Sequence, residues 1–592
     1  MVRAVESGVH SGRAENGQSV ARRKGSETGQ PRLADRYAAW TVRRTSAATG
    51  FLSQPEPRSI GLYARGKQIV AGNILLAGHL VTSKPGVSLW DLAAPDPAFA
   101  AEAQGFAWLD DLAALGTPEA RRLAQDWTRD WIRRFGRGRG PGWTPGLTGR
   151  RVIRWTHHAL FLLSHQDAAA QDLLLAALTR QAAYLARRAR AARPGLPRFE
   201  ALIGLLYAGL SLEGMERHTA PALDALCREC ETEINGEGGL ATRNPEELLD
   251  ILTLLAWAIR ALAETDRQIP PQLSQTVDRI APCLRVLRHS DGGLARFHGG
   301  GAGREGRLDQ ALTASAIPRP SGHLARAMGY NRLSGGRTSV IVDAADPPGG
   351  AAAATAHAST AAFELTSGRR PLIVSCGSGR GFGTEWQLAG RATQSHSALC
   401  IDGFSSSRFG RDTRDDRLAE RAHVSGLRST AGDGAMVVLS HDGWSASHGL
   451  TATRELHLSA DGRRLGGTDV LAAQTAAERA RFDRMGLDGT AFSLRFHLHP
   501  DVDASLDMGG HAVSMQLRSG EIWVFRHTSL SQLALEPSAY LEEGRLKPRP
   551  TRQIVLSGVA RTHETRIGWT LAKAQDTPLA IRDLDRDEPV PI

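Results

Sequence analysis

The fold is decided by the stretch between residues 357 and 403, which reads HASTAAFELTSGRRPLIVSCG (357–377) and RATQSHSALCIDG (391–403). Short apolar runs around a Ser-Gly turn are typical of β-strands, and we expect His357, Arg391 and His396 to lie on such strands. An imidazole carries protons near neutral pH or binds a metal, and a guanidinium group binds carboxylates. The stretch therefore predicts a β domain that carries groups able to do chemistry.

Alternating patterns continue around this stretch. Residues 329–343 predict two strands that are joined at a Ser-Gly-Gly turn. Alternation recurs at residues 437–439, 457–465, 492–499 and 513–525, with Asp-Gly or Ser-Gly turns between the runs. Many short strands with such turns predict an antiparallel β-sandwich, which we place at residues 318–592.

The preceding half has helical periodicity. From about residue 60 to residue 315, apolar residues recur at spacings of three and four, for example at Trp127 and Trp131. Gly- and Pro-containing loops separate these stripes at regular intervals. Many helices joined by short loops predict antiparallel neighbours, so residues 51–317 form a helical bundle or a helical toroid.

Charge is concentrated at the start of the chain. The 592 residues have a formal net charge of +10, and residues 1–50 contribute nine Lys or Arg against four Asp or Glu. The rest of the chain is therefore almost balanced, which argues against a nucleic-acid partner. Residues 1–50 also lack sustained apolar periodicity, and we expect them to be a disordered basic tail.

The sequence was also compared with the patterns of membrane spans and signal peptides, and it matches neither. The sequence contains no run of 18 apolar residues, so we expect no transmembrane helix. The Gly/Ser/Arg/Glu-rich beginning lacks the apolar segment of a secretory signal peptide. Cytoplasmic location is the default expectation, and the sequence leaves both the compartment and the oligomeric state open.

The whole pattern after residue 60 resembles the heparinase II/III-like family of polysaccharide lyases. The resemblance rests on the 357–403 stretch together with GNILLAG (72–78), WDL (90–92) and FAWLDDL (106–112). It implies an α+β multidomain fold, in which an N-terminal (α/α) toroid-type helical domain precedes an antiparallel β-sandwich domain. It also implies β-elimination on acidic, uronate-containing glycans. That reaction needs groups that neutralise a carboxylate, remove a proton and protonate a leaving oxygen.

This sequence departs from the family pattern in the toroid. Leu196 and Pro197 stand where the family has an Asn-His pair, and Glu247 stands where it has a tyrosine. Neither leucine nor proline can transfer a proton. By position, Glu247 is the candidate catalytic residue of the helical domain. The polar residues that we expect to bind substrate are Arg198, Glu200, Arg243, Asn244 and, in the sandwich, Trp386.

Structural alternatives exist for several of these residues. The order Asn-Pro-Glu-Glu is a helix-start signature, so Asn244 is also expected as a helix N-cap. Arg198 and Glu200 are equally compatible with ion pairs between helices or on the surface.

In the sandwich, the resemblance makes His357, His396 and Arg391 the candidate catalytic residues. The family's neighbouring ligands are changed, because Ser359 and Ser375 stand at aspartate positions and Thr355 at a histidine position. Two histidines with one hydroxyl make a poor zinc site. We therefore expect no cofactor, with a structural zinc at His357 and His396 as the alternative.

Two functions follow from the sequence. The first is a carbon–oxygen lyase that cleaves acidic polysaccharides by β-elimination. The second is a non-catalytic protein on the same scaffold that binds glycans or assembles the cell envelope. Loss of the Asn-His pair and the tyrosine favours the second, and retention of the two histidines favours the first.

Overall fold

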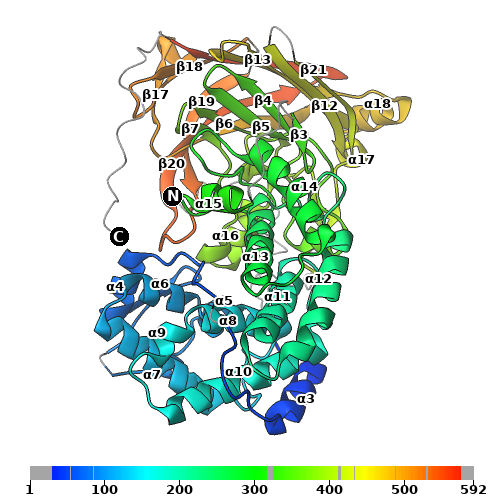
Figure 1. The fold of residues 1–592 in the computed structure, drawn as a ribbon. Helices are drawn as coiled ribbons and strands as arrows, with labels where there is room; N and C mark the ends of the chain where they lie inside the picture. Colours follow the sequence, from blue (N-terminus) through cyan, green and yellow to red (C-terminus); the bar gives the residue numbers. More distant parts are fainter. Residues whose placement is uncertain are drawn as a thin grey trace.

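A computed structural model describes residues 30–574 except 54, 85, 316–324, 411–414, 432–433, 487 and 529–530. Figure 1 shows two stacked sheets above a helical part, with helices α11 to α14 (green) lying between the sheets and the first helices (blue). The chain thus divides into a helical half and a β half, in the predicted order.

The helical half is built from antiparallel neighbours, with α11 packed against α8, α10, α12 and α13. A two-stranded hairpin, β1 (Asn73–Leu76) and β2 (His79–Thr82), is inserted near its beginning. The helices are α3 (Leu33–Thr41), α4 (Tyr63–Val70), α5 (Pro97–Gln104), α6 (Ala107–Leu115), α7 (Pro118–Phe135), α8 (Pro145–His157), α9 (Ala159–Leu163), α10 (Ala168–Arg188), α11 (Leu196–Ser211), α12 (Thr219–Glu233), α13 (Pro245–Glu264), α14 (Pro271–Leu287) and α15 (Arg307–Ala314).

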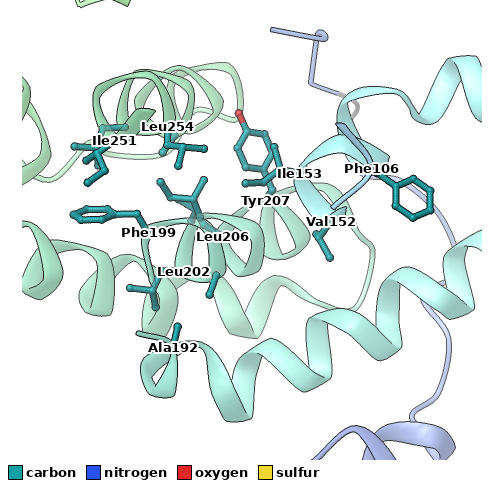
Figure 2. Close-up of a cluster of buried hydrophobic side chains, with 14 of the residues drawn as sticks. Phe106, Val152, Ile153, Ala192, Phe199, Leu202, Leu206, Tyr207, Ile251 and Leu254 are labelled. Carbon is teal, nitrogen blue, oxygen red and sulfur yellow. The ribbon is translucent and has the colours of Figure 1, made fainter. Parts of the chain in front are cut away.

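Helix α11 is the buried centre of this half. Figure 2 shows its side chains Phe199 and Leu206 directed toward Ile251 and Leu254 of α13, with Ile153 of α8 near Tyr207. All six of these residues are at most 8% exposed, and every residue of α11 from Phe199 to Ser211 is buried, so the helix is packed on nearly every face.

Two glycines set the distance between α8 and α11. A Cβ on Gly204 would lie 2.6 Å from Cα of Gly149, closer than a real Cβ approaches any atom. Only glycine permits this crossing. The close packing brings Arg150 of α8 beside Glu200 of α11.

The β half consists of two antiparallel sheets and short connecting helices. One sheet has the order β19-β20-β15-β7-β6-β5-β4-β3, with β8 also paired to β15, and the other has the order β11-β12-β13-β14-β21-β18-β17-β16. The strands of the first sheet are β3 (Arg326–Ala327), β4 (Tyr330–Gly335), β5 (Thr338–Asp343), β6 (Phe363–Ser367), β7 (Arg370–Val374), β8 (Leu399–Ile401), β15 (Thr490–Leu498), β19 (Gln532–Tyr540) and β20 (Arg549–Ala560). Those of the second are β11 (Val424–Ala431), β12 (Gly434–Trp444), β13 (Leu450–Ser459), β14 (Arg464–Ala472), β16 (Asp503–Asp507), β17 (Ala512–Gln516), β18 (Ile522–His527) and β21 (Glu564–Lys573). The remaining elements are the pair β9 (Arg408–Phe409) and β10 (Leu418–Glu420) and the helices α16 (Thr384–Gly390), α17 (Ser445–His448) and α18 (Ala476–Asp483).

The sheets enclose one apolar core. Phe363 and Phe496 from the first sheet pack against Trp569 of the second, with ring centroids 5.7 and 4.7 Å from the Trp569 ring. Inward-facing residues of both sheets belong to the same buried cluster. This is the predicted sandwich, and the two strands expected in residues 329–343 are β4 and β5.

The two halves share buried side chains. Met328 in the turn between β3 and β4, Tyr330 of β4 and Ile341 of β5 belong to the core of the helical half. The Tyr330 hydroxyl donates to the Arg243 carbonyl at 2.6 Å, which ties the sheet to the loop before α13. Buried side chains from the start of the sandwich thus pack into the core of the helical half.

One sequence prediction about the ends of the domains is wrong in part. Residues Leu33–Arg44, which we assigned to a disordered tail, form α3 and a 3₁₀ turn. The helix is held because Asp35 accepts from Arg188 of α10 at 2.8 Å, a long-range pair that the local composition does not reveal. Residues 1–29 and the expected boundary at 317–318 lie outside the described residues.

Among the described helices, none is both long enough and apolar enough to cross a membrane.

Candidate functional site

A cleft of about 2230 Å³ lies where the helical half meets the sandwich. Its walls come from α8, α11 and α13, from the loop at residues 299–305, and from the segment at residues 540–545 that follows β19. Since a cavity of this size admits several sugar rings or a comparable chain, it is the main candidate site.

Helix α13 forms one wall along its length. Glu246, Asp250, Thr253 and Trp257 all line the cleft, at the i, i+4, i+7 and i+11 positions that share one helix face. At 1.5 Å per residue, this face extends for about 16 Å. The helix starts where predicted, because the Asn244 side chain accepts from the Glu246 and Glu247 backbone N–H groups at 3.0 and 3.2 Å. The wall therefore suits an extended ligand.

Carboxylates gather at the beginning of this wall. Glu246 accepts from the Gly301 N–H at 2.8 Å, Asp250 pairs with Arg307 at 2.5 Å, and the exposed Glu543 approaches from the sandwich side. Burial, and then the charges of Glu543 and Asp250, raise the pKa of Glu246 to about 7. A carboxyl group with such a pKa can gain or lose a proton near neutrality.

Glu247, the candidate catalytic residue of the helical half, also lines the cleft. It accepts from the Thr242 hydroxyl at 2.7 Å and from the Leu196 N–H at 3.4 Å. Burial raises its pKa. Glu247 thus holds together the beginnings of α11 and α13, while its neighbour Glu246 contacts the loop at Gly301.

The wall made by α8 and α11 is polar but self-paired. Arg150 donates to both carboxylate oxygens of Glu200, at 2.7 and 3.0 Å. The charge of Glu200 raises the pKa of Arg150. Glu200 therefore reaches the cleft as predicted, but with a cation already bound.

The sandwich wall contributes Tyr540 and Arg296. The Arg296 guanidinium lies over the Tyr540 ring, 4.2 Å from its centroid, and its backbone N–H donates to Glu364 at 3.0 Å. The Tyr540 side chain is 8% exposed, and its hydroxyl has no hydrogen bond to any residue that the structure describes. Burial raises its pKa, with Arg296 opposing the shift.

The charge of the cleft as a whole is close to balanced. Its described lining contains twelve arginines and no lysine, against fourteen aspartates and glutamates. Several of the arginines are bound by carboxylates of the same walls, as for Arg150 and Arg307. Such a surface has no excess positive charge with which to hold a polyanion.

His357 and His396 lie together but away from the cleft. Their ring nitrogens, Nδ1 and Nε2 respectively, are 3.2 Å apart, and His396 Nδ1 is 3.0 Å from the Ser375 hydroxyl. They are 2% and 0% exposed and do not line the cavity. Burial holds the pKa of His357 well below its usual value and lowers that of His396 to about 4, so both rings are neutral.

The placement of these rings corrects the strand prediction. His357 lies in the loop before β6, and His396 directly follows a 3₁₀ turn at Thr393–Ser395. The turn forms because Thr393 donates its hydroxyl to the Ala358 carbonyl at 2.8 Å, so that the two loops hold each other. The extended pattern starts only at the strands that follow.

A third histidine, which the sequence analysis missed, extends this cluster. His298 Nδ1 accepts from the His357 backbone N–H at 3.1 Å, so its proton lies on Nε2, 3.2 Å from Asp343. Asp343 also accepts from the Ser359 hydroxyl at 2.6 Å and pairs with Arg243. We call His298, Asp343, Arg243, His357 and His396 the buried histidine network.

Arg243 belongs to this network and not to the cleft lining. Its guanidinium donates to the Met328, Gly329, Ala345 and Asp346 carbonyls at 2.8–3.2 Å, and to Asp343. All five of its N–H groups are used. The prediction that Arg243 binds substrate is therefore wrong in this structure: the residue joins the start of α13 to the sandwich.

Three further candidates are also placed outside the cleft lining. Arg391 is 3% exposed and donates to the carbonyls of Ala353, Ala356 and Asp416 at 2.8–2.9 Å, so it fixes loops instead of presenting a carboxylate clamp. Arg198 pairs with Glu229 of α12 at 3.1 Å, which is the ion pair left open by the sequence. The half-buried Trp386 lies on α16.

The donor groups around His357 and His396 decide whether a metal ion fits there. Within the described ranges, no three His, Cys, Asp or Glu side chains are arranged to hold a metal ion. His357 and His396 have Ser375 as their neighbour, a hydroxyl in place of the third ligand that zinc requires.

Comparison with known proteins gives a consistent picture. The family model described as heparinase II/III-like, C-terminal, matches residues 317–570. The FtsZ-localized protein C of Caulobacter vibrioides is 32% identical over 541 residues, covering 89% of this chain and 91% of that protein.

Solved structures resemble the chain over nearly its full length. A heparinase III structure matches 96% of this chain and 91% of its own, with a TM-score of 0.66 and 12% identity. Two structures of heparan sulfate lyase HepC from Pedobacter heparinus, one of them a mutant, match 96–97% of this chain and 90–92% of their own, with TM-scores of 0.55–0.56 and 14–15% identity. At this level of identity, these likenesses concern the fold alone.

Proposed function

This chain belongs to the heparinase II/III-like family, and from that premise we propose that it binds a glycan in its interdomain cleft without cleaving it, as a component of the cell-division machinery. The cleft, which runs along α13 and faces both domains, supports glycan binding. The name of the relative from Caulobacter vibrioides, an FtsZ-localized protein, supports a place at the division site.

One observation carries the non-catalytic part of the proposal. The two histidines that match the family pattern are buried and neutral, while the cleft retains only Leu196 and Pro197 at the matching toroid positions. A proton-transfer group must come within hydrogen-bond reach of the substrate. Neither His357 nor His396 meets that condition in this arrangement.

Two measurements test the proposal. Isothermal titration of a glycan panel, containing neutral, acidic and amino-sugar oligosaccharides, is expected to give binding that depends on cleft residues. The same mixtures are expected to show no gain in ultraviolet absorbance, which is the signal of the unsaturated ends that β-elimination produces. Absence of binding to every glycan would refute the proposal. A gain in absorbance would show that the protein cleaves the glycan, and it would refute the non-catalytic part of the proposal.

The cellular part needs its own test. A fluorescent fusion of this chain is expected to gather where FtsZ gathers and to disperse when FtsZ is depleted. A fusion that remains evenly distributed in dividing cells would remove the division-site part of the proposal and leave glycan binding untouched.

β-Elimination on uronate-containing glycans is the second candidate function, and one observation favours it. Glu246 lines the cleft with a pKa of about 7, the range in which a general acid or base works best. Such a lyase would use Glu246 in place of the missing proton-transfer groups. Turnover that is lost in Glu246→Gln and retained in His396→Leu would support this alternative.

A further inference from the structure

His157, the last residue of α8, lies in the wall of the cleft with both of its ring nitrogens unused. The residue is 2% exposed, and neither Nδ1 nor Nε2 has a hydrogen-bond partner among the described residues. Burial lowers its pKa to about 3, so the ring is neutral and offers one donor and one acceptor. Buried polar atoms without partners are rare and unfavourable, so a ligand that supplies both partners gains free energy here.

Arg58, which precedes α4, adds a second unused group at the same end of the cleft. One of its terminal nitrogens pairs with Glu264, but its Nε–H is buried and donates to no residue in the described part of the chain. After burial, the charge of Arg58 contributes to the pKa of both His157 and Tyr207, so the guanidinium lies near both rings. Three polar atoms from two segments are thus left without partners in one place.

Trp257 supplies an aromatic surface beside these atoms. It is half-buried on α13 and lines the cleft, and its ring centroid is 5.2 Å from that of His157 at an interplanar angle of 71°. Tyr207 meets the same imidazole at 5.0 Å, and its hydroxyl donates to the Trp257 carbonyl at 3.2 Å. An aromatic wall with a few polar groups is the usual composition of a small-ligand pocket.

The charged side chains around His157 are already paired within the protein. Arg154 is bound by Asp110 at 2.8 Å, Asp110 lies 2.9 Å from the His158 ring, and Arg58 pairs with Glu264. A ligand carboxylate would therefore compete with carboxylates that these arginines already hold. An uncharged ligand with hydroxyl groups needs no such exchange.

Resting on the proposed glycan function, we propose that His157, Arg58 and Trp257 form a subsite for one uncharged sugar ring, three turns of α13 away from Glu246. Two neighbouring ring hydroxyls supply the acceptors and the donor that the imidazole and the Arg58 Nε–H lack, while the C–H face of the sugar packs on Trp257. Because the imidazole nitrogens are covered in this structure, the Trp257 ring shifts when the hydroxyls enter. The preferred ligand is then a chain with uncharged sugars and not a polyuronate.

The test compares three oligosaccharides of equal length. Glucose, N-acetylglucosamine and uronate oligomers are titrated into the full chain by calorimetry near neutral pH, at low and at high salt. The tighter of the two uncharged oligomers is expected to bind at least about tenfold more tightly than the uronate oligomer. Its affinity is expected to change less than about twofold with salt, because no ion pair forms with the ligand.

Variants locate the effect. His157→Phe keeps an aromatic ring and removes both nitrogens, and it is expected to weaken binding of the uncharged oligomer about tenfold without lowering the melting temperature. His157→Gln restores a donor and an acceptor and is expected to recover part of the affinity. Arg58→Lys keeps the charge beside Glu264, loses the Nε–H and is expected to weaken binding severalfold. The matched control is His218→Phe, at a half-buried histidine outside the cleft lining, which should leave all affinities unchanged.

The outcomes separate this inference from the proposed function. If the uronate oligomer binds as tightly as the uncharged ones, or if folded His157→Phe keeps the wild-type affinity, the subsite is wrong and glycan binding stands. Should His157→Phe fail to fold, wild-type affinity in Arg58→Lys would overturn the subsite in its place. If none of the three oligomers binds the folded wild type, both proposals fall.

Discussion

The interdomain cleft and the buried histidine network contain the same kinds of side chains, but they differ in how far the charged and polar groups are paired. In the network, Asp343 lies beside Arg243 and His298, and almost every polar atom has a partner. In the cleft, Glu246 lies near Glu543 and Asp250, and neither ring nitrogen of His157 has a hydrogen-bond partner among the described residues. Both regions perturb pKa values. The difference teaches that a perturbed group indicates a binding site only where its charge or hydrogen bond is left for a ligand to satisfy.

The two regions also predict opposite responses to pH. Histidines with lowered pKa values contribute stability that is present above pH 6.5 and is lost as the pH falls, through about 4 for His396. A carboxyl group with a raised pKa does the reverse. For Glu246, stability is present below 4.5 and is lost as the pH rises through about 7.

The largest expected loss of stability comes from breaking the ion pair between Asp343 and Arg243 in the buried histidine network. Burial alone would raise the pKa of Asp343, but Arg243 and then His298 outweigh it and hold the pKa well below its usual range. Asp343→Ala leaves the Arg243 charge buried without its partner, and we expect the free energy of unfolding to fall by about 3–5 kcal/mol. Denaturant unfolding followed by circular dichroism measures this loss.

The control for that change is Asp309→Ala. Asp309 forms an exposed ion pair with Arg288 at 2.7 Å, and its removal should change the free energy of unfolding by less than about 1 kcal/mol. Equal losses in Asp343→Ala and Asp309→Ala would mean that the network does not hold the two halves together.

A smaller effect is expected from His396→Leu. The substitution leaves the Ser375 hydroxyl and His357 Nδ1 without partners, which destabilises the fold by about 1–3 kcal/mol. It also removes one group that must be neutral in the folded state. The loss of stability between pH 6.5 and about 4 should therefore be shallower than in the wild type.

The glycan affinity of His396→Leu distinguishes a structural role of His396 from a role in binding. If His396 is structural, the folded His396→Leu protein binds glycans as the wild type does. A loss of affinity without a loss of stability would instead show that the network takes part in binding.

The opposite sign is expected for Glu246→Gln. The variant no longer ionises a half-buried group beside Asp250 and Glu543, so above pH 7 it should be more stable than the wild type. The gain should be about 1–2 kcal/mol, since the half-buried position allows partial solvent screening of the full shift. Thermal unfolding at several pH values should give equal stabilities below 4.5 and a gap that opens toward 7.

Much of this comparison was accessible from the sequence. The helical spacing and the alternation of strands gave the order of the two halves, and the Asn-Pro-Glu-Glu signature gave the start of α13. Leu196 and Pro197 showed from the sequence that the family's usual proton-transfer groups are absent at those positions. These inferences depend on neighbours within a few residues, where local physical chemistry decides the structure.

The content of the site depended on contacts between distant segments. Glu246 and Glu543 are nearly 300 positions apart, and only the packing of both halves brings them to Gly301. The burial of His357 and His396 follows from loop contacts with Ala358 and His298, which have no periodic signal. The one local hint was the pair of glutamates after the Asn244 cap, of which the sequence favoured Glu247 over Glu246.

The smallest effect on stability, and the sharpest contrast with the network, is expected from Tyr540→Phe. The hydroxyl has no partner among the described residues, so its removal should change the free energy of unfolding by less than about 0.5 kcal/mol. In the variant, the ring still lies under the Arg296 guanidinium and meets the His499 ring edge-on, with the two ring centroids 5.0 Å apart. Glycan affinity, by contrast, should fall severalfold, because a bound ligand loses its hydrogen bond to the hydroxyl. Calorimetric titration beside thermal unfolding measures both. A variant that loses stability and keeps affinity would assign Tyr540 to the structure of the sandwich wall and not to the ligand, which is the pattern that we expect of His396.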